Sequence, residues 1–172
     1  MMKRAIAIMG MPGSGKSTVG RLVASRLGWR YVSTGELARQ LIDGEWSALG
    51  LMAPESEMRR VFKEAVSDYD AVVIDGMPRK PDQVDFLDSI FDEVCYYVLS
   101  LDEQTARNRL YSRGRSDDTK IAIERRLSDY KRYTAKAIKR AMDIHGATIV
   151  DVTNKAPWEI ADVISLRVAG GK

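Results

Sequence analysis

The sequence has very little cysteine or histidine: Cys95 and His145 are the only ones among its 172 residues. A single cysteine excludes a disulfide framework and a cysteine-cluster zinc site, and a lone histidine has no second one to share a site with. We therefore expect Cys95 to be a core residue and His145 to be structural. No apolar run approaches the ~18 residues that would span a bilayer, and the apolar stretch 5–9 is too short for a signal peptide. These absences predict a soluble, cytoplasmic protein with no membrane partner.

The net charge is small, but its distribution along the chain is uneven. The whole chain carries 27 basic and 24 acidic residues, for a net charge of +3. Residues 107–140 alone contain twelve basic and four acidic residues. This local excess of positive charge indicates either a segment that meets an anion or one solvated helix face, and charge alone does not decide between them.

Short apolar runs alternate with longer helical patterns along a chain of one-domain length. The predicted strands are 5–9, 31–33, 71–74, 94–100 and 147–152, and they are continuously apolar rather than alternating. The predicted helices are 16–27, 35–42, 54–67, 81–90, 103–113, 118–144 and 157–168. This order is typical of an α/β fold with a five-stranded parallel sheet flanked by helices. Such sheets bind ligands beyond the carboxyl ends of their strands.

A phosphate-binding motif follows the first predicted strand. Residues 10–18 read GMPGSGKST and satisfy G-x-x-x-x-G-K-[ST] between a strand and a helix. The glycines let backbone N–H groups turn toward phosphate oxygens, and the following helix adds its positive end. The motif predicts a P-loop NTPase fold with ATP as phosphoryl donor. The predicted ATP-binding residues are Gly10, Pro12, Gly13, Ser14, Gly15, Lys16, Ser17 and Thr18.

Two residues near this motif are candidates for holding Mg²⁺. Ser17 should offer its hydroxyl to the ion, while Lys16 reaches the β- and γ-phosphates. Asp75 ends the third apolar run, where a carboxylate can hold Mg²⁺, partly through water. Asp-Gly is also a common turn, so Asp75 alone would be a weak signal. Its position after a buried strand in a chain with a phosphate loop makes a role in metal binding a stronger prediction.

Two further clusters carry a resemblance to a known family. Residues 33–39 (STGELAR) come at the end of the second predicted strand, and residues 75–83 (DGMPRKPDQ) follow the third. Each places an arginine, Arg39 or Arg79, where it could grip a phosphate. With the phosphate loop, the chain resembles the adenylate kinase-type nucleoside monophosphate kinases over about residues 5–151. The resemblance implies one domain, 1–172, with an acceptor-binding helical insert at about 34–62 and a lid at about 113–118.

The resemblance also assigns roles on the acceptor side. Arg39 and Arg79 would hold the acceptor phosphate, while Thr34 and Gln83 would face its base. Gln83 can both donate to and accept from an adenine edge, and relatives specialised for UMP or CMP tend to carry Ala and Asn at these two places, so AMP is favoured. The full implied acceptor set is Thr34, Gly35, Arg39, Met52, Ala53, Gly76, Arg79, Gln83, Arg115 and Arg126. In two departures from the family pattern, Met77 replaces the usual Phe and the insert is shorter by about ten residues.

The basic stretch gains a function from the same resemblance. Arg113, Arg115 and Arg126 would be lid and transfer-site arginines, and Arg109 would lie near the ATP base and phosphates. The implied catalytic set is Lys16, Arg79, Arg113, Arg115 and Arg126. Only Gly114 separates the first two lid arginines, so the lid would be very short and would exclude less water, which makes ATP hydrolysis a side reaction. The later basic residues, 131–140, are typical of a solvated helix face.

The predicted function is therefore a monomeric phosphotransferase that uses Mg-ATP and AMP to form two ADP. One alternative is a kinase for another monophosphate, such as CMP, UMP or a deoxynucleotide. A second alternative is an adenylate kinase-like ATPase in RNA or ribonucleoprotein assembly, suggested by the short insert, the short lid and the basic helix. The complete acceptor set argues against this second alternative, so nucleic acid is not the favoured partner.

Overall fold

A five-stranded parallel sheet forms the centre of the computed structural model, which describes residues 2–42, 49 and 51–170. The strands are β1 (Arg4–Gly10), β2 (Arg30–Ser33), β3 (Ala71–Asp75), β4 (Glu93–Ser100) and β5 (Thr148–Asp151), in the order β2-β3-β1-β4-β5. Each lies close to a strand expected from the sequence. The predicted α/β fold of the P-loop class, with a parallel sheet flanked by helices, is confirmed.

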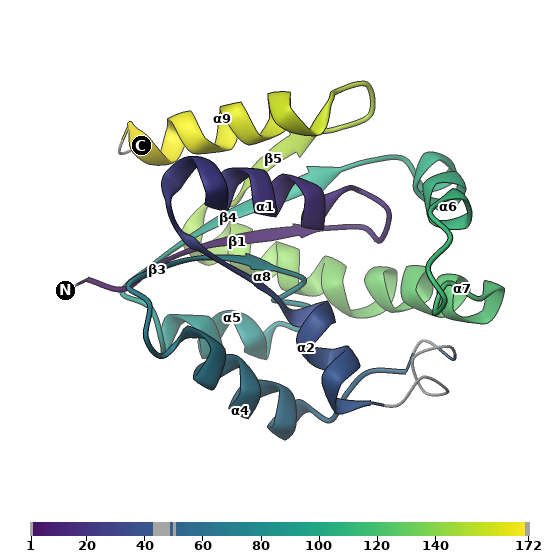
Figure 1. Ribbon diagram of the computed structural model, residues 1–172, viewed down its shortest axis with the longest axis horizontal. Coiled ribbons are helices and arrows are strands. Elements are labelled where there is room, and N and C mark those ends of the chain that lie inside the picture. Colours follow the sequence, from purple (N-terminus) through teal and green to yellow (C-terminus); the bar gives the residue numbers. More distant parts are fainter. Residues whose placement is uncertain (1, 43–48, 50, 171–172) are drawn as a thin grey trace.

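The strands are continuously apolar because helices cover both faces of the sheet. Ile6 and Ile8 of β1 pack into one core, and Ala5 and Ala7 of the same strand pack into another. In Figure 1, α1 (Lys16–Leu27) and α9 (Pro157–Ala169) lie on one side of the sheet. The helices α4 (Glu55–Val66), α5 (Asp82–Asp88) and α8 (Ala135–His145) lie on the other. The sheet is therefore the middle layer of three.

The remaining helices gather beyond the carboxyl ends of the strands. They are α2 (Thr34–Leu41), α6 (Glu103–Ser112) and α7 (Lys120–Asp129). Leu110, Ile123 and Leu127 form a small apolar cluster between α6 and α7, apart from the two main cores. Residues 113–119 join these two helices, so the arginines of this loop are carried by a packed helix pair.

The prediction of one regular helix over 118–144 is wrong, because this segment is not a continuous α-helix. The structure has α7, then a π-helical segment (Tyr130–Thr134), then α8. A π-helical turn widens the helix and shifts the faces that the 3.6-residue period would assign. Ala137 and Ala141 of α8 can thus pack on the sheet while α7 packs on α6. Apolar periodicity over a basic, mixed segment did not indicate this shift.

Part of the predicted acceptor-binding insert, 34–62, falls on residues 43–48 and 50, which lie outside the described residues. The described portion comprises α2, residues 49 and 51–54, and the first two turns of α4. Within residues 2–42, 49 and 51–170, no helix combines the length and apolarity that a membrane span requires.

Candidate functional site

The phosphate loop, residues 10–15, connects β1 to α1 at the centre of the sheet. Gly13 and Gly15 adopt φ of 87° and 88°, a region that favours glycine. A Cβ atom on Gly13 would lie 2.5 Å from the Ala106 carbonyl oxygen, whereas one on Gly15 would meet nothing within 4 Å. Gly15 caps α1, whose first N–H groups and positive dipole end face the loop. The loop is therefore shaped as a cradle for an anion.

Lys16 lies across this cradle. Its Nζ donates to the carbonyl oxygens of Gly10 and Met11, each at 2.9 Å. Burial lowers the pKa of Lys16 from 10.5 to about 8; the charge of Asp75 opposes this, and those of Arg79 and Arg113 add to it. An ammonium group that is partly desolvated and close to other cations is stabilised by an anion that binds beside it. The electrostatics thus favour phosphate at this point.

Ser17 and Asp75 meet beside the loop. The Ser17 hydroxyl donates to Asp75 Oδ2 at 2.6 Å, and the Tyr31 hydroxyl donates to the same oxygen at 3.0 Å. A hydroxyl and one carboxylate fit Mg²⁺, which usually takes one or two carboxylates together with substrate phosphates and water. Among the described residues, no group of three or more His, Cys, Asp or Glu could hold a metal ion instead. Tyr31 was not found from the sequence, because its distance from Asp75 is set by the pairing of β2 with β3.

The acceptor-side residues surround the turn that follows β3. The buried Thr34 hydroxyl donates to the Asp75 carbonyl oxygen at 3.0 Å, and Arg79 Nε donates to the Gly76 carbonyl oxygen at 2.7 Å. Gly76 has φ of 88°, and a Cβ there would lie 2.7 Å from Thr34 Oγ1 and 3.2 Å from the Arg79 guanidinium. Only glycine lets Thr34 and Arg79 approach this turn together. Arg79 remains exposed, and partial desolvation together with the charges of Arg126 and Arg39 lowers its pKa against the opposing charges of Asp75 and Asp129.

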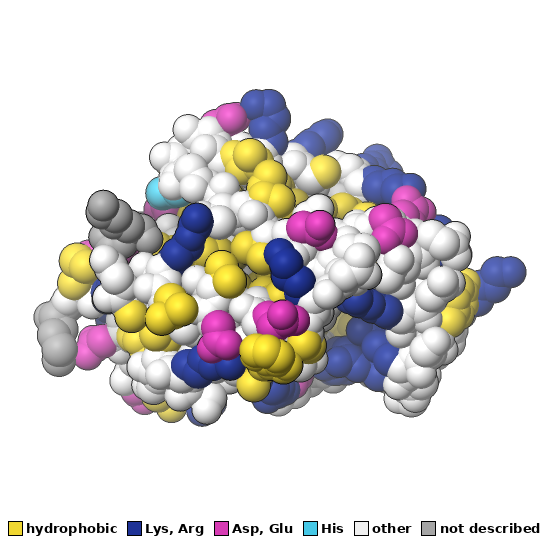
Figure 2. All heavy atoms as spheres, turned by 90° about the horizontal axis from the view of Figure 1, so that it is seen from above, with side chains coloured by type: hydrophobic (Ala, Val, Ile, Leu, Met, Phe, Trp, Pro, Cys, Tyr) yellow, Lys and Arg dark blue, Asp and Glu magenta, His cyan; other side chains and the backbone are white. Residues whose placement is uncertain are grey.

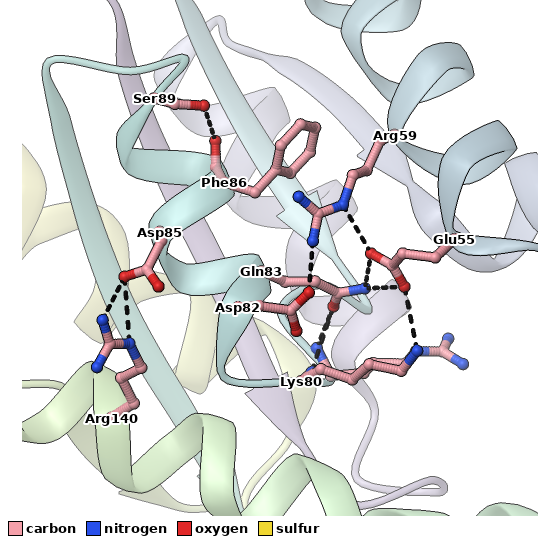
Figure 3. Close-up of polar contacts among 10 residues, drawn as sticks. Glu55, Arg59, Lys80, Asp82, Gln83, Asp85, Phe86, Ser89 and Arg140 are labelled. Atoms are coloured by element: carbon pink, nitrogen blue, oxygen red, sulfur yellow. Dashed lines mark hydrogen bonds and ion pairs between the residues drawn. The ribbon is translucent and has the colours of Figure 1, made fainter.

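Gln83 is buried, and its side-chain amide links the turn after β3 to α4 (Figure 3). Its Oε1 accepts from the Arg79 backbone N–H at 2.6 Å, and its Nε2 lies 3.0 and 3.1 Å from the two carboxylate oxygens of Glu55. Glu55 also accepts from Arg59 and Lys80, at 3.0 and 3.3 Å. Sequence reasoning missed Glu55, because it belongs to α4, 28 residues before Gln83.

Asp117 and Asp118, in the loop between α6 and α7, hold Arg113 of the same loop and Arg126 of α7. Asp118 accepts from Arg113 at 2.7 Å and from Arg126 at 2.7 Å, and Asp117 accepts from Arg126 at 2.8 Å. Burial alone would raise the pKa of Asp118, but the hydrogen bond from Arg113 and the charges of both arginines outweigh it and lower that pKa. Partial desolvation and the nearby charges of Arg113 and Arg39 lower the pKa of the exposed Arg115. Asp117 and Asp118 thus position Arg113 and Arg126, and Arg115 adds positive charge near Arg113.

One cavity of about 820 Å³ brings these groups together. Its lining includes every predicted site residue except Ser14: Gly10, Pro12, Gly13, Gly15, Lys16, Ser17, Thr18, Thr34, Gly35, Arg39, Met52, Ala53, Asp75, Gly76, Arg79, Gln83, Arg109, Arg113, Arg115 and Arg126. Ser14 is buried beneath the loop, where its hydroxyl has no hydrogen-bond partner among the described residues. Figure 2 shows Lys and Arg side chains around a hollow near the end of the molecule where α6 and α7 lie.

The later basic residues mainly meet carboxylates. Lys131 pairs with Glu103 of α6 at 2.6 Å, Arg140 pairs with Asp85 of α5 at 2.5 Å, and Lys139 pairs with its helix neighbour Asp143 at 2.7 Å. These groups are largely exposed, so each pair contributes little stability. The solvated face expected for residues 131–140 agrees with this exposure, and two of its cations, Lys131 and Arg140, also pair with carboxylates of neighbouring helices.

Comparisons with known proteins agree with this geometry. A family model described as an AAA domain matches residues 9–124. The adenylate kinase of Prochlorococcus marinus (strain MIT 9301) is 30% identical over 166 residues, covering 87% of this chain and 91% of that protein. The adenylate kinase of Corynebacterium glutamicum (strain R) is 30% identical over 96% of this chain and 98% of its own length. Adenylate kinase isoenzyme 5 of Homo sapiens is 33% identical over 79% of this chain and 28% of that protein.

The matches extend over the phosphate loop, the acceptor-side turn and the arginines between α6 and α7, which the structure gathers around one cavity. The similarity extends over nearly the full length of two relatives, so it is not limited to the phosphate loop. The chain therefore belongs to the adenylate kinase family and is a nucleoside monophosphate kinase with the P-loop fold.

Proposed function

We propose that the protein transfers the γ-phosphoryl group of Mg-ATP to AMP, giving two ADP. The observation that carries this proposal is the single cavity in which the phosphate loop and the acceptor-side residues face one another. A phosphoryl donor on the loop and a monophosphate between Arg39 and Arg79 would share that space. Thr34 and Gln83, which line the same cavity, support a base-reading role on the acceptor side.

In this mechanism an oxygen of the acceptor phosphate attacks the γ-phosphorus, and the bond from that phosphorus to the β-phosphate bridging oxygen breaks. No covalent enzyme intermediate is needed, because positioning and charge neutralisation supply the catalysis. Lys16 contacts the transferring phosphoryl group from the side of the phosphate loop. The arginines on the acceptor and lid sides surround the same group: Arg79, Arg113, Arg115 and Arg126. Arg109 supports the donor. Asp118 orients two of these arginines through the hydrogen bonds described above.

Mg²⁺ would be held by Ser17 directly and by Asp75 directly or through water, and it would neutralise charge on the β- and γ-phosphates. With the ion bound, the Ser17 hydroxyl would be a ligand instead of a donor to Asp75. The Tyr31 hydroxyl, which contacts Asp75 Oδ2 from β2, would keep this carboxylate oriented. The residues of this chain thus fit the metal without further carboxylates.

Residues 113–118, in the loop between α6 and α7, would act as a very short lid. A lid of this size covers less of the donor phosphates, so we expect measurable ATP hydrolysis without acceptor. The described α2 and α4 would form the acceptor-binding insert. These assignments rest on the positions of Arg113, Arg115 and Arg39 around the cavity.

A panel of monophosphates tests the proposal. Purified protein is given Mg-ATP with AMP, CMP, UMP, GMP or dAMP, and diphosphate formation is compared with hydrolysis in the absence of acceptor. We expect AMP to give the highest kcat/KM. Preference for CMP or UMP would overturn the base assignment, and hydrolysis that no monophosphate changes would overturn the transfer itself.

A further inference from the structure

The outer face of α9 carries large apolar side chains that are exposed. Trp158, Val163 and Leu166 are 58%, 46% and 73% exposed, and Leu166 is the most exposed large hydrophobic side chain among the described residues. The inner face of the same helix, with Ile160 and Ile164, is buried in the core on this side of the sheet. Figure 1 shows α9 as the outermost helix on this side, and Figure 2 looks onto it. Exposed apolar side chains gathered on one surface helix are typical of a protein interaction site.

The three charged side chains of α9 are held in place by contacts within the chain. Glu159 accepts from the backbone N–H of the N-cap residue at 2.6 Å, and Asp162 pairs with Arg26 of α1 at 3.1 Å. Arg167 donates to the Thr148 hydroxyl of β5 at 3.3 Å. Glu159 uses one carboxylate oxygen in its contact and Arg167 uses one N–H donor. Each can therefore form a further ion pair from a fixed position on the helix.

The charges and apolar residues of this face are arranged so that the face is complementary to itself. Glu159, Val163 and Arg167 follow one another at intervals of four residues, so they lie along one stripe of α9, with Leu166 beside it. If a second copy of the helix lies antiparallel about a twofold axis at Val163, Glu159 of each copy meets Arg167 of the other. The apolar side chains then meet between these two pairs. A parallel pairing would instead place like charges together, so the pattern favours the antiparallel one.

We infer that α9 is a homodimer interface, on which a second copy of this chain packs its own α9 in the antiparallel orientation. Val163 and Leu166 form the apolar centre, and two Glu159–Arg167 pairs flank it. None of these four residues lines the cavity, so the inference is independent of the proposed function. It differs from the monomer expected from the sequence. One helix face is small beside a standard interface of about 1,600 Å², so we expect a weak dimer with a dissociation constant of about 10–100 µM.

Sedimentation equilibrium of the purified protein at about 5 to 500 µM measures this association, a range that brackets the expected dissociation constant. We expect the mean mass to rise from 19.3 kDa toward twice that value and no further, because a twofold interface closes on itself. Val163→Glu places two carboxylates together on the twofold axis and should raise the dissociation constant at least about tenfold. A wild type that stays at the monomer mass throughout, or that grows beyond a dimer, overturns the inference.

Met142→Glu is the matched control. Met142 is 41% exposed, close to the exposure of Val163, and it belongs to α8 on the opposite side of the sheet. This variant adds the same charge to a helix surface, but it should dimerise as the wild type does. An equal loss of dimer in both variants would assign the effect to net charge and overturn the inference. A loss in Met142→Glu alone would place the interface on α8 and overturn it too.

An exchange of charges tests the antiparallel orientation. Glu159→Arg and Arg167→Glu each place like charges at both ends of the pairing, so each variant alone should dimerise at least about tenfold more weakly than the wild type. An equimolar mixture of the two variants brings opposite charges together again and should recover a dissociation constant close to the wild-type value. Recovery in the mixture cannot come from a folding defect of either variant. A mixture that associates no better than its components, while circular dichroism shows both to be folded, overturns the antiparallel pairing.

Discussion

Replacing Lys16 by methionine should stabilise the folded protein in the absence of nucleotide while abolishing catalysis. The side chain is held among cations and carbonyl groups, and its pKa falls from 10.5 to about 8. Because one pKa unit corresponds to about 1.4 kcal/mol, the ionised lysine costs the folded state about 3 kcal/mol. Methionine has a similar length and no charge, but it forfeits the hydrogen bonds to Gly10 and Met11. We therefore expect a net gain of about 1 to 3 kcal/mol at pH 7.

The lowered pKa of Lys16 also determines how the stability difference between the two proteins changes with pH. Because the folded-state pKa of Lys16 is lowered, the unfolded chain binds more protons than the folded one between about pH 8 and pH 10.5. Stability rises with pH wherever the unfolded state binds more protons. The cost of Lys16 is thus fully present below about pH 8 and disappears as the pH rises toward 10.5. The stability difference between Lys16→Met and the wild type should shrink over the same range.

Urea denaturation followed by tryptophan fluorescence measures both proteins at pH 7, 8, 9 and 10. Other groups titrate in this range, but they are shared, so the difference between the two proteins isolates Lys16. A variant that is less stable at pH 7, or a difference that does not change with pH, would refute the electrostatic argument. Added Mg-ATP should stabilise the wild type and leave the stability of Lys16→Met unchanged, because only the wild type has the ammonium group that binds the ATP phosphates.

Three further substitutions test other parts of the structure. Phe62→Ala removes a fully buried ring of α4 and should cost about 3–5 kcal/mol of unfolding free energy in the same denaturation assay. Gly13→Ala places a methyl group 2.5 Å from the Ala106 carbonyl oxygen at φ of 87°. It should lower the free energy of unfolding by about 1–3 kcal/mol and weaken ATP binding measured by calorimetry. Tyr31→Phe removes one of the two hydroxyls on Asp75 Oδ2 and should raise the Mg²⁺ concentration that gives half-maximal rate several-fold, with little change at saturating Mg²⁺. Unchanged stability, unchanged binding and unchanged Mg²⁺ dependence, respectively, would contradict these expectations.

The phosphate loop could be predicted from the sequence because its constraints are local. Glycines at fixed offsets, followed by Lys16 and a helix, specify a backbone shape that few other contexts require. The buried strands could be predicted for a similar reason, since continuous apolar runs report coverage on both faces. Asp75 belongs to this group, because it follows directly from the end of such a strand.

The parts that could not be predicted depend on distances between elements. Tyr31 reaches Asp75 through the register of β2 and β3, and Glu55 reaches Gln83 because α4 packs beside the turn before α5. The π-helical segment at Tyr130–Thr134 was also missed. Its residues carry no glycine or proline to mark a change in helical geometry, so a local pattern predicts one regular helix there.

Phosphoryl transfer to AMP is tested most directly by following the transferred phosphorus itself. The protein is incubated with ATP labelled with ³²P at the γ-position, together with AMP and Mg²⁺, and the products are separated by chromatography. We expect the label in the β-phosphate of newly formed ADP, and we expect Arg79→Ala to reduce this transfer by orders of magnitude. Label found only in inorganic phosphate, released at the same rate with and without AMP, would contradict it.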